Sequence, residues 1–258
     1  MTSDYLKRTR SLNEVYDLID NNRAEAAKAA QSRFHHDMEA AIAAIASIGS
    51  IAGARVLADS RVASAHVLID AELAASRLLA EAEIQAAKCA KEALSRPSEV
   101  VEAALKEIGR TTSLLLVNTA KGSVEKIQQD AEAAIKVLRE TGAIAIREVQ
   151  ALADSVTRQT KQDAELAAAR LAEYRKQSRT LDEAVAAGED LAKQVLQAAE
   201  DASAQLRSTI EATLENINTI TEAACSRVLE AAAEAKRKVE EGRAQASARL
   251  RETLKTYM

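Results

Sequence analysis

The sequence predicts an all-α protein, built as an elongated antiparallel bundle of three long, alanine-rich helices that pack like a coiled coil. The 258 residues include one proline and seven glycines, so little interrupts a helix. Aromatic residues make up 2% of the chain and charged residues 29%. This composition is typical of long helices rather than of a globular enzyme.

The first helix is expected over about residues 12–95, after an N-terminal tail of residues 1–10. Ser11 and Glu14 fit a capping box, in which the serine hydroxyl accepts a backbone amide hydrogen and the glutamate reaches back. Pro97 restricts the residue before it to extended conformations. The first helix should therefore end just before this proline.

The second helix is expected over about residues 98–178 and the third over about residues 181–257, after a second capping box from Thr180 to Glu183. This second break contains neither glycine nor proline, so a two-helix hairpin with a very long second helix is an alternative. Each segment starts with acidic residues and ends with basic ones, which suits the helix dipole. Residues 11–258 would then form a single rod-like domain of helices ~120 Å long.

Folding the chain back at the two breaks sets a register that can be tested. Residue i of the first helix should lie near residue 193 − i of the second. The uncharged run Ala40–Ala54 then meets Arg139–Ala153 and Leu206–Ile220, which also contain uncharged runs. Apolar residues recur in steps of three and four, with a mean spacing nearer ~3.67 than ~3.5. That spacing predicts a straight or slightly right-handed bundle.

The exposed helix faces carry acidic residues followed by basic ones four positions later. Examples are Glu102 with Lys106 and Glu234 with Lys238. Side chains at this spacing are neighbours on a helix surface, and the acid-before-base order is the stabilising one. We expect such pairs to support long helices whose alanine faces bury little area.

Two stretches carry more large apolar residues than one buried helix face can hold. The first also contains a pair of glycines four residues apart, which permits close backbone packing. We expect both stretches to supply core contacts or contacts between subunits, and for the second stretch the two alternatives are equally open. The residues are Ile42, Ile45, Ile48, Gly49, Ile51 and Gly53, followed by Leu114, Leu115, Leu116 and Val117.

Catalytic, metal-binding and cofactor-binding patterns are not found in the sequence, so we expect no catalytic residue, no metal and no cofactor. His35 and Glu39 share a helix face, but His36 points elsewhere, and two ligands do not make a metal site. Cys89 and Cys225 are expected to be buried small hydrophobic residues that form no disulfide. A net charge of −4 and few aromatic residues argue against nucleic-acid binding.

The sequence also suggests where the protein works. The N-terminus lacks the apolar stretch of a signal peptide. The longest uncharged run, Ala40–Ala54, would measure ~22 Å as a helix, which is too short to cross ~30 Å of hydrocarbon. We therefore expect a cytoplasmic protein with no transmembrane segment.

The function predicted from these features is that of a non-enzymatic structural protein. Its alanine-rich and locally over-apolar helix faces would self-associate into a homo-oligomer or a filament-like assembly. One alternative is an amphipathic helical protein that binds a lipid or storage-granule surface, as apolipoprotein-like proteins do. Another is a signalling or scaffold bundle, because the composition resembles that of the alanine-rich cytoplasmic hairpins of bacterial chemoreceptors.

Overall fold

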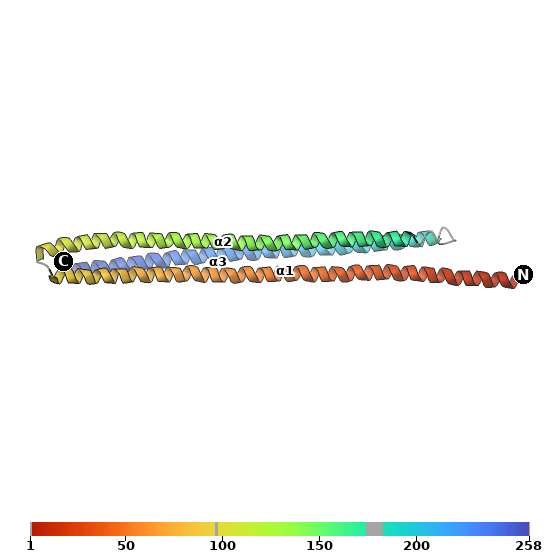
Figure 1. Ribbon diagram of the computed structural model, residues 1–258, viewed down its shortest axis with the longest axis horizontal. Helices are drawn as coiled ribbons and strands as arrows, with labels where there is room; N and C mark the ends of the chain where they lie inside the picture. The colour runs from red at the N-terminus through yellow and green to blue at the C-terminus, as the bar shows by residue number, and fades with distance from the viewer. Residues whose placement is uncertain (1, 96–97, 174–182, 258) are drawn as a thin grey trace. The chain divides into compact units, whose positions relative to one another are not determined.

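The computed structural model is helical throughout the residues that it describes, and Figure 1 shows how its long helices are labelled. Backbone is described for residues 2–95, 98–173 and 183–257, and side chains for residues 21–95, 100–171 and 188–257. The helices are α1 (Thr2–Ser95), α2 (Ser98–Glu173) and α3 (Glu183–Tyr257). The prediction of an all-α fold with three long helices is confirmed.

The helix ends agree with the sequence at Pro97 and differ from it at the N-terminus. α1 ends at Ser95 and α2 begins at Ser98, as predicted. α1 already begins at Thr2, so residues 2–10 extend the helix and do not form a separate tail. Ser11 lies inside this helix and cannot cap its start, because neither glycine nor proline interrupts the preceding residues. Of the second capping box, only Glu183, the first residue of α3, lies within the described residues.

The chain divides into two compact units, and all three helices contribute to each. Unit 1 comprises Met1–Ala52 and Ile144–Ile217. Unit 2 comprises Gly53–Ala143 and Asn218–Met258.

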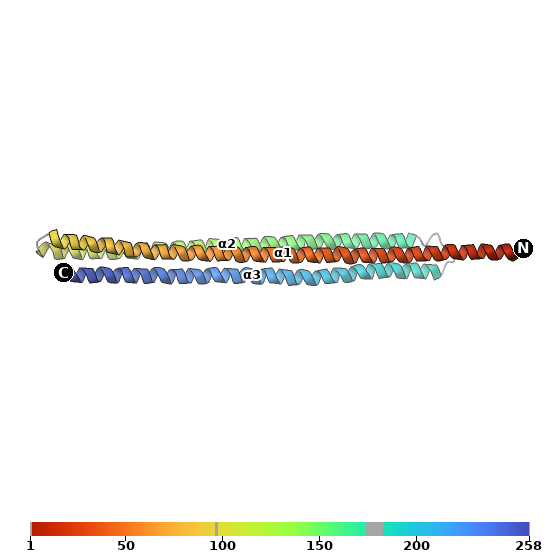
Figure 2. The same ribbon diagram turned by 90° about the horizontal axis from the view of Figure 1, so that it is seen from below.

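In unit 2, α1 and α3 run in the same direction with a fixed offset. Lys238 Nζ lies 2.7 Å from a carboxylate oxygen of Glu72. Further along both helices, a guanidinium nitrogen of Arg249 lies 2.6 Å from Glu83. Both pairs are separated by 166 residues, the offset that the two predicted fold-back points imply. Figure 2 shows the two helices side by side.

α2 runs antiparallel to its two neighbours in unit 2. Lys126 Nζ lies 3.0 Å from Asp70 of α1, and Lys236 Nζ donates to the side-chain oxygen of Gln128 at 3.2 Å. The residue numbers of the first pair sum to 196 rather than the predicted 193. The predicted register between α1 and α2 is therefore correct to within one helical turn.

Unit 1 brings together the three low-charge stretches that the sequence aligned. Its larger core cluster includes Ala41, Ile45, Ala145, Val149, Ala153, Leu206 and Ile217. In its second cluster, the backbone oxygen of Leu171 lies 3.9 Å from the position that a Cβ atom on Gly188 would occupy. Since α2 and α3 pack together here with opposite directions, the alternative of one continuous second helix is wrong.

In each helix, one series of core residues recurs at every eleventh position. None of the residues in these series is more than 6% exposed. In α1 they are Phe34, Ile45, Val56, Val67, Leu78 and Cys89; in α2 they are Leu105, Leu116, Ile127, Leu138, Val149, Thr160 and Leu171; in α3 they are Val195, Leu206, Ile217, Val228, Val239 and Leu250. An eleven-residue repeat over three turns gives about 3.67 residues per turn. This confirms the spacing predicted from the sequence and, within each unit, keeps one face of each helix toward the core.

Candidate interaction surface on helix α1

The first over-apolar stretch divides between the core and the surface. Ile45 is fully buried. Gly49 is also buried, and Thr213 Cγ2 lies 2.5 Å from the position that a Cβ atom on this glycine would occupy. Ile51, by contrast, is 66% exposed. Ile42 and Ile48 of this stretch are half-buried and pack on the core of unit 1. Gly53 is buried and faces Ile220, and both residues belong to unit 2.

The second over-apolar stretch contributes one residue to the core. Leu116 is fully buried, whereas Leu114, Leu115 and Val117 are 54%, 43% and 44% exposed. Successive residues of an α-helix point about 100° apart, so four in a row cannot share one face. The interpretation of this stretch as a locally thick core is therefore wrong.

A second apolar face, which the sequence analysis missed, lies on α1 within unit 2. Val62, Ile69, Leu73 and Ile84 are between 46% and 58% exposed. Val62, Leu73 and Ile84 follow one another at every eleventh position, and Ile69 lies one turn before Leu73. Exposed alanines fill the same face at positions 58, 65, 80 and 87. We call these four large residues and four alanines the outer seam.

The sequence signal for the outer seam is an eleven-residue repeat. The segments Val62–Glu72, Leu73–Glu83 and Ile84–Leu94 align position by position. Each begins with a large apolar residue that is exposed, and each carries a buried apolar residue five positions later. A helix with apolar residues on opposite faces is normally covered on both.

Charged residues border the outer seam on both sides. One border is basic and consists of the exposed residues Arg55, His66, Arg77 and Lys88, which follow the same repeat. At about 3.67 residues per turn, the other border contains Glu72 and Glu83, whose carboxylates bind Lys238 and Arg249 of α3. The hydrogen bond that Lys238 donates to the carboxylate of Glu72 raises the pKa of Lys238 and so favours its charged form. The outer seam is thus an apolar stripe between a basic and an acidic border.

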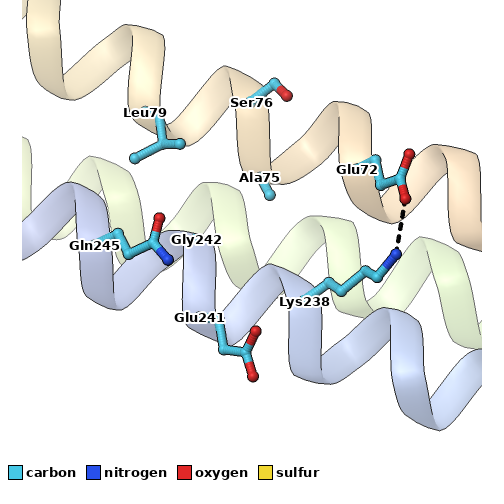
Figure 3. Close-up of a pocket in the computed structure, with 8 residues that line it drawn as sticks. All are labelled: Glu72, Ala75, Ser76, Leu79, Lys238, Glu241, Gly242 and Gln245. Atoms are coloured by element: carbon cyan, nitrogen blue, oxygen red, sulfur yellow. Dashed lines mark hydrogen bonds and ion pairs between the residues drawn. The ribbon is translucent and has the colours of Figure 1, made fainter.

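A groove between α1 and α3 adjoins the acidic border, and Figure 3 shows its lining. Its volume is about 390 Å³. Ala75 of α1 faces Gly242 of α3, and Leu79 adds alkyl surface. The ion pair between Glu72 and Lys238 crosses the groove. Side-chain polar groups come from Ser76, Glu241 and Gln245.

A second groove, of about 500 Å³, lies between α2 and α3 in unit 1. Two basic residues, Lys161 and Arg207, and two acidic residues, Glu165 and Glu200, line this groove. Leu196 supplies its large apolar surface. Neither groove concentrates charge of one sign.

The histidine and cysteine predictions can be compared with the structure residue by residue. His35 Nε2 lies 3.2 Å from Glu39 on an exposed face, as the spacing predicted. Cys89 and Cys225 are free and buried, which confirms their interpretation as small core residues. Burial raises the pKa of both thiols. Within the described part of the chain, no group of three or more His, Cys, Asp or Glu residues could hold a metal ion.

α1 also contains a long apolar segment. Among the described residues, one 18-residue window within Asn21–Ser95 is long and apolar enough to cross a membrane. Only 28% of that window is buried. Core helices of soluble proteins pass the same test, so length and composition do not decide between the two environments.

Comparisons with known proteins identify a fold and no family. No family model matches the sequence, and no curated protein matches it. The chain is similar to a solved structure described as a "Computationally designed three helix bundle", with a TM-score of 0.63 and 12% identity. The similarity covers 93% of this chain and 99% of that one. At this identity the likeness shows the three-helix fold alone.

Proposed function

We propose that this protein is a non-enzymatic structural protein that self-associates through the outer seam of α1 into a homo-oligomer. The observation that carries the proposal is the alignment of Val62, Ile69, Leu73 and Ile84 on one exposed face. Exposed apolar patches on soluble proteins often mark interaction sites. A second copy of the chain would remove the patch from water.

The energetic argument rests on burial. Full burial of a Val, Leu or Ile side chain contributes about 1.5–3 kcal/mol, and roughly half of each seam residue is still accessible to water. Four such residues with four alanines can therefore supply several kcal/mol to an interface. The alanines also let a partner helix approach to the short end of the ~8–10 Å range of interhelical distances.

Growth beyond a small oligomer would need a second, different contact face. Leu114, Leu115 and Val117 on α2 are exposed and provide candidate contacts of this kind. An interface that joins two different faces propagates into a filament unless its rotation closes a ring. A filament would therefore require contacts through α2 as well, whereas the small oligomer requires only the outer seam of α1.

A second candidate function is binding to a lipid or storage-granule surface. The largely unburied apolar window of α1 supports it. Interfacial helices usually place Trp, Phe and Leu at such surfaces. This chain has no tryptophan, and its one phenylalanine, Phe34, is buried. We therefore rank surface binding below self-association.

Sedimentation velocity and light scattering of the parent and two variants test the proposal. The double variant Leu73→Asp/Ile84→Asp places charges on the outer seam, and Val137→Asp makes the same change at an exposed apolar position of α2. We expect a parent oligomer at micromolar concentration, a 27.6 kDa monomer for the double variant and an unchanged oligomer for Val137→Asp. Circular dichroism should show equal helicity in all three.

Two results would contradict self-association through this face. A parent protein that stays monomeric at hundreds of micromolar would rule out the homo-oligomer. An oligomer that survives both charges on the outer seam would place the interface elsewhere. A monomeric parent that sediments with liposomes, and loses that binding in the double variant, would instead establish the surface-binding candidate.

A further inference from the structure

We infer that the outer seam binds the outer seam of a second copy in parallel and in register, so that the basic border of each copy faces the acidic border of the other. This inference rests on the proposed self-association and specifies its geometry. Three features of α1 support it: the period of the seam, the difference between its two borders and the uneven charge along the acidic side.

The period of the outer seam selects the kind of helix that can cover it. Val62, Leu73 and Ile84 repeat at every eleventh position, which corresponds to about 3.67 residues per turn. A partner helix with a seven-residue repeat follows about 3.5 residues per turn, so its apolar face would rotate away along the contact. A second copy of α1 presents the same period and therefore stays in contact over the whole seam.

The two borders select the orientation. In a parallel pair of identical helices, opposite borders meet, whereas in an antiparallel pair each border meets its own copy. An antiparallel pair would therefore set Arg55, His66, Arg77 and Lys88 against the same basic residues of the partner. Contacts among Arg55, Arg77 and Lys88 of the two copies would be like-charge contacts, which are destabilising. A parallel pair brings this basic border to the carboxylates of the acidic border instead.

The acidic border also selects the register. Its eleven-residue series reads Arg61, Glu72, Glu83 and Leu94, so carboxylates occupy only the middle. With the two copies in register, Arg77 lies at the level between the two carboxylates of the other copy. A slip by one repeat shortens the apolar contact, because Val62 of one copy and Ile84 of the other lose their seam partners. It also leaves Arg77 of each copy beside one carboxylate instead of two. The in-register pair therefore has the largest number of opposite-charge contacts.

Glu72 and Glu83 can accept these contacts without losing their own. Each already binds a base of α3, at 2.7 Å and 2.6 Å. An ionised carboxylate has about four lone-pair sites, so a second cation can share it. The side chains of both glutamates are 64% exposed, so they are accessible to a partner. Because the network is exposed, added salt should weaken it.

Cysteine cross-linking tests the orientation directly. Ala58→Cys and Ala80→Cys, made separately, each place one exposed thiol on the outer seam, and the buried native cysteines stay in place. The two positions lie ~33 Å apart along the helix at ~1.5 Å per residue. In a parallel, in-register pair each new thiol meets its own copy, so both variants should form disulfide-linked dimers under mild oxidation. The parent should form none.

An antiparallel pair cannot give the same pattern. Its twofold axis crosses the helix at one level, so at most one of the two positions meets its own copy. The parallel geometry is overturned if both variants sediment as dimers but only one of them, or neither, forms the disulfide. The proposed self-association would still stand. A parent without any dimer in sedimentation refutes the proposed self-association itself.

Charge reversal gives a second test, with opposite signs for the two geometries. Arg77→Glu/Lys88→Glu should weaken a parallel dimer at least tenfold, because it sets acid against acid. The same variant should strengthen an antiparallel dimer, since the new acids would meet Arg55 and His66. The control Lys121→Glu/Lys136→Glu reverses two exposed bases of α2 and should leave the dimer affinity unchanged. A tighter or unchanged dimer for the α1 variant overturns the inference.

Discussion

The Cα atom of Ala75 lies 2.9 Å from the position that a Cβ atom on Gly242 would occupy, and the Cβ atom of Ala75 lies 2.7 Å from it. Real Cβ atoms essentially never approach another heavy atom so closely. Both atoms belong to positions that no side-chain rotation can move. α1 and α3 therefore approach each other at Gly242 in a way that only glycine permits (Figure 3).

Substituting this glycine should destabilise the protein even though alanine is the better helix former. We expect Gly242→Ala to cost about 1–3 kcal/mol, because α1 and α3 must separate around the new methyl group. Gly122→Ala is the matched control, since nothing lies within 4 Å of the position that its Cβ atom would occupy. The control should stabilise the protein by about 0.5–1 kcal/mol. Urea denaturation followed by circular dichroism measures both, and equal stabilisation would contradict the close approach.

Neighbouring leucines of α2 should differ sharply in their contribution to stability. Leu116 is fully buried, so Leu116→Ala should lower the free energy of unfolding by about 2–5 kcal/mol. Leu114 is 54% exposed, and Leu114→Ala should change it by about 0.5 kcal/mol or less. The same denaturation experiment compares them. Similar losses for both variants would show that this stretch is packed on more than one side.

The sequence was sufficient to predict the fold class because its signals are local and strong. Pro97 separates α1 from α2 by a steric rule that does not depend on tertiary structure. The offset of 166 residues between α1 and α3 follows from chain length and two turns alone. The predicted start of α1 is wrong, because the pattern of Ser11 and Glu14 occurs inside helices as well as at their ends.

Interactions between helices were harder to predict than those within one helix. Lys106 lies 2.5 Å from Glu102, the partner predicted four residues earlier. The same spacing pairs Lys238 with Glu234, but the structure places Lys238 on Glu72 of α1. Spacing along one helix cannot show which residues a neighbouring helix presents.

The outer seam escaped sequence reasoning for a related reason. Val62, Leu73 and Ile84 are separated by alanines and charged residues, so no local run of apolar residues marks them. Their alignment becomes visible once the buried eleven-residue series fixes which way α1 faces. The two stretches that were visible in the sequence proved to be mixtures of core and surface positions.

Three isoleucines of α1 should respond in order to the same acidic substitution. Ile45→Asp places an unpaired charge at a fully buried position and should cause the largest loss of stability, about 3 kcal/mol or more. Ile48 is half-buried against the same core, so Ile48→Asp should cause an intermediate loss. Ile51→Asp should cause the smallest, because that side chain is 66% exposed. Thermal unfolding ranks the variants, and a different order would contradict the orientation of α1 in unit 1.

The buried thiols should make stability fall at alkaline pH. Burial raises the pKa of Cys89 and of Cys225 above the ordinary value of 9.0, so the folded protein holds these protons more tightly than the unfolded chain. Their contribution to stability is fully present below about pH 9 and is lost as the pH rises through the native pKa. Urea denaturation at pH 8 and at pH 10 should show this loss. In Cys89→Ala/Cys225→Ala the fall in stability between pH 8 and pH 10 should be smaller. This variant should also be less stable than the parent at pH 8, because two buried sulfur atoms are gone.

Thiol labelling gives the same argument a kinetic form. The thiolate is the reactive species, so a raised pKa and full burial should both slow reaction with an aromatic disulfide reagent. At pH 8 we expect Cys89 and Cys225 to react at least about 100-fold more slowly in the folded protein than in urea, because labelling requires local opening. The exposed thiol of Ala133→Cys on α2, outside the outer seam, serves as the fast reference in the folded state. Equal rates for that thiol and the native pair would mean that the buried positions of α1 and α3 open freely, and the assignment of both cysteines to the core would fail.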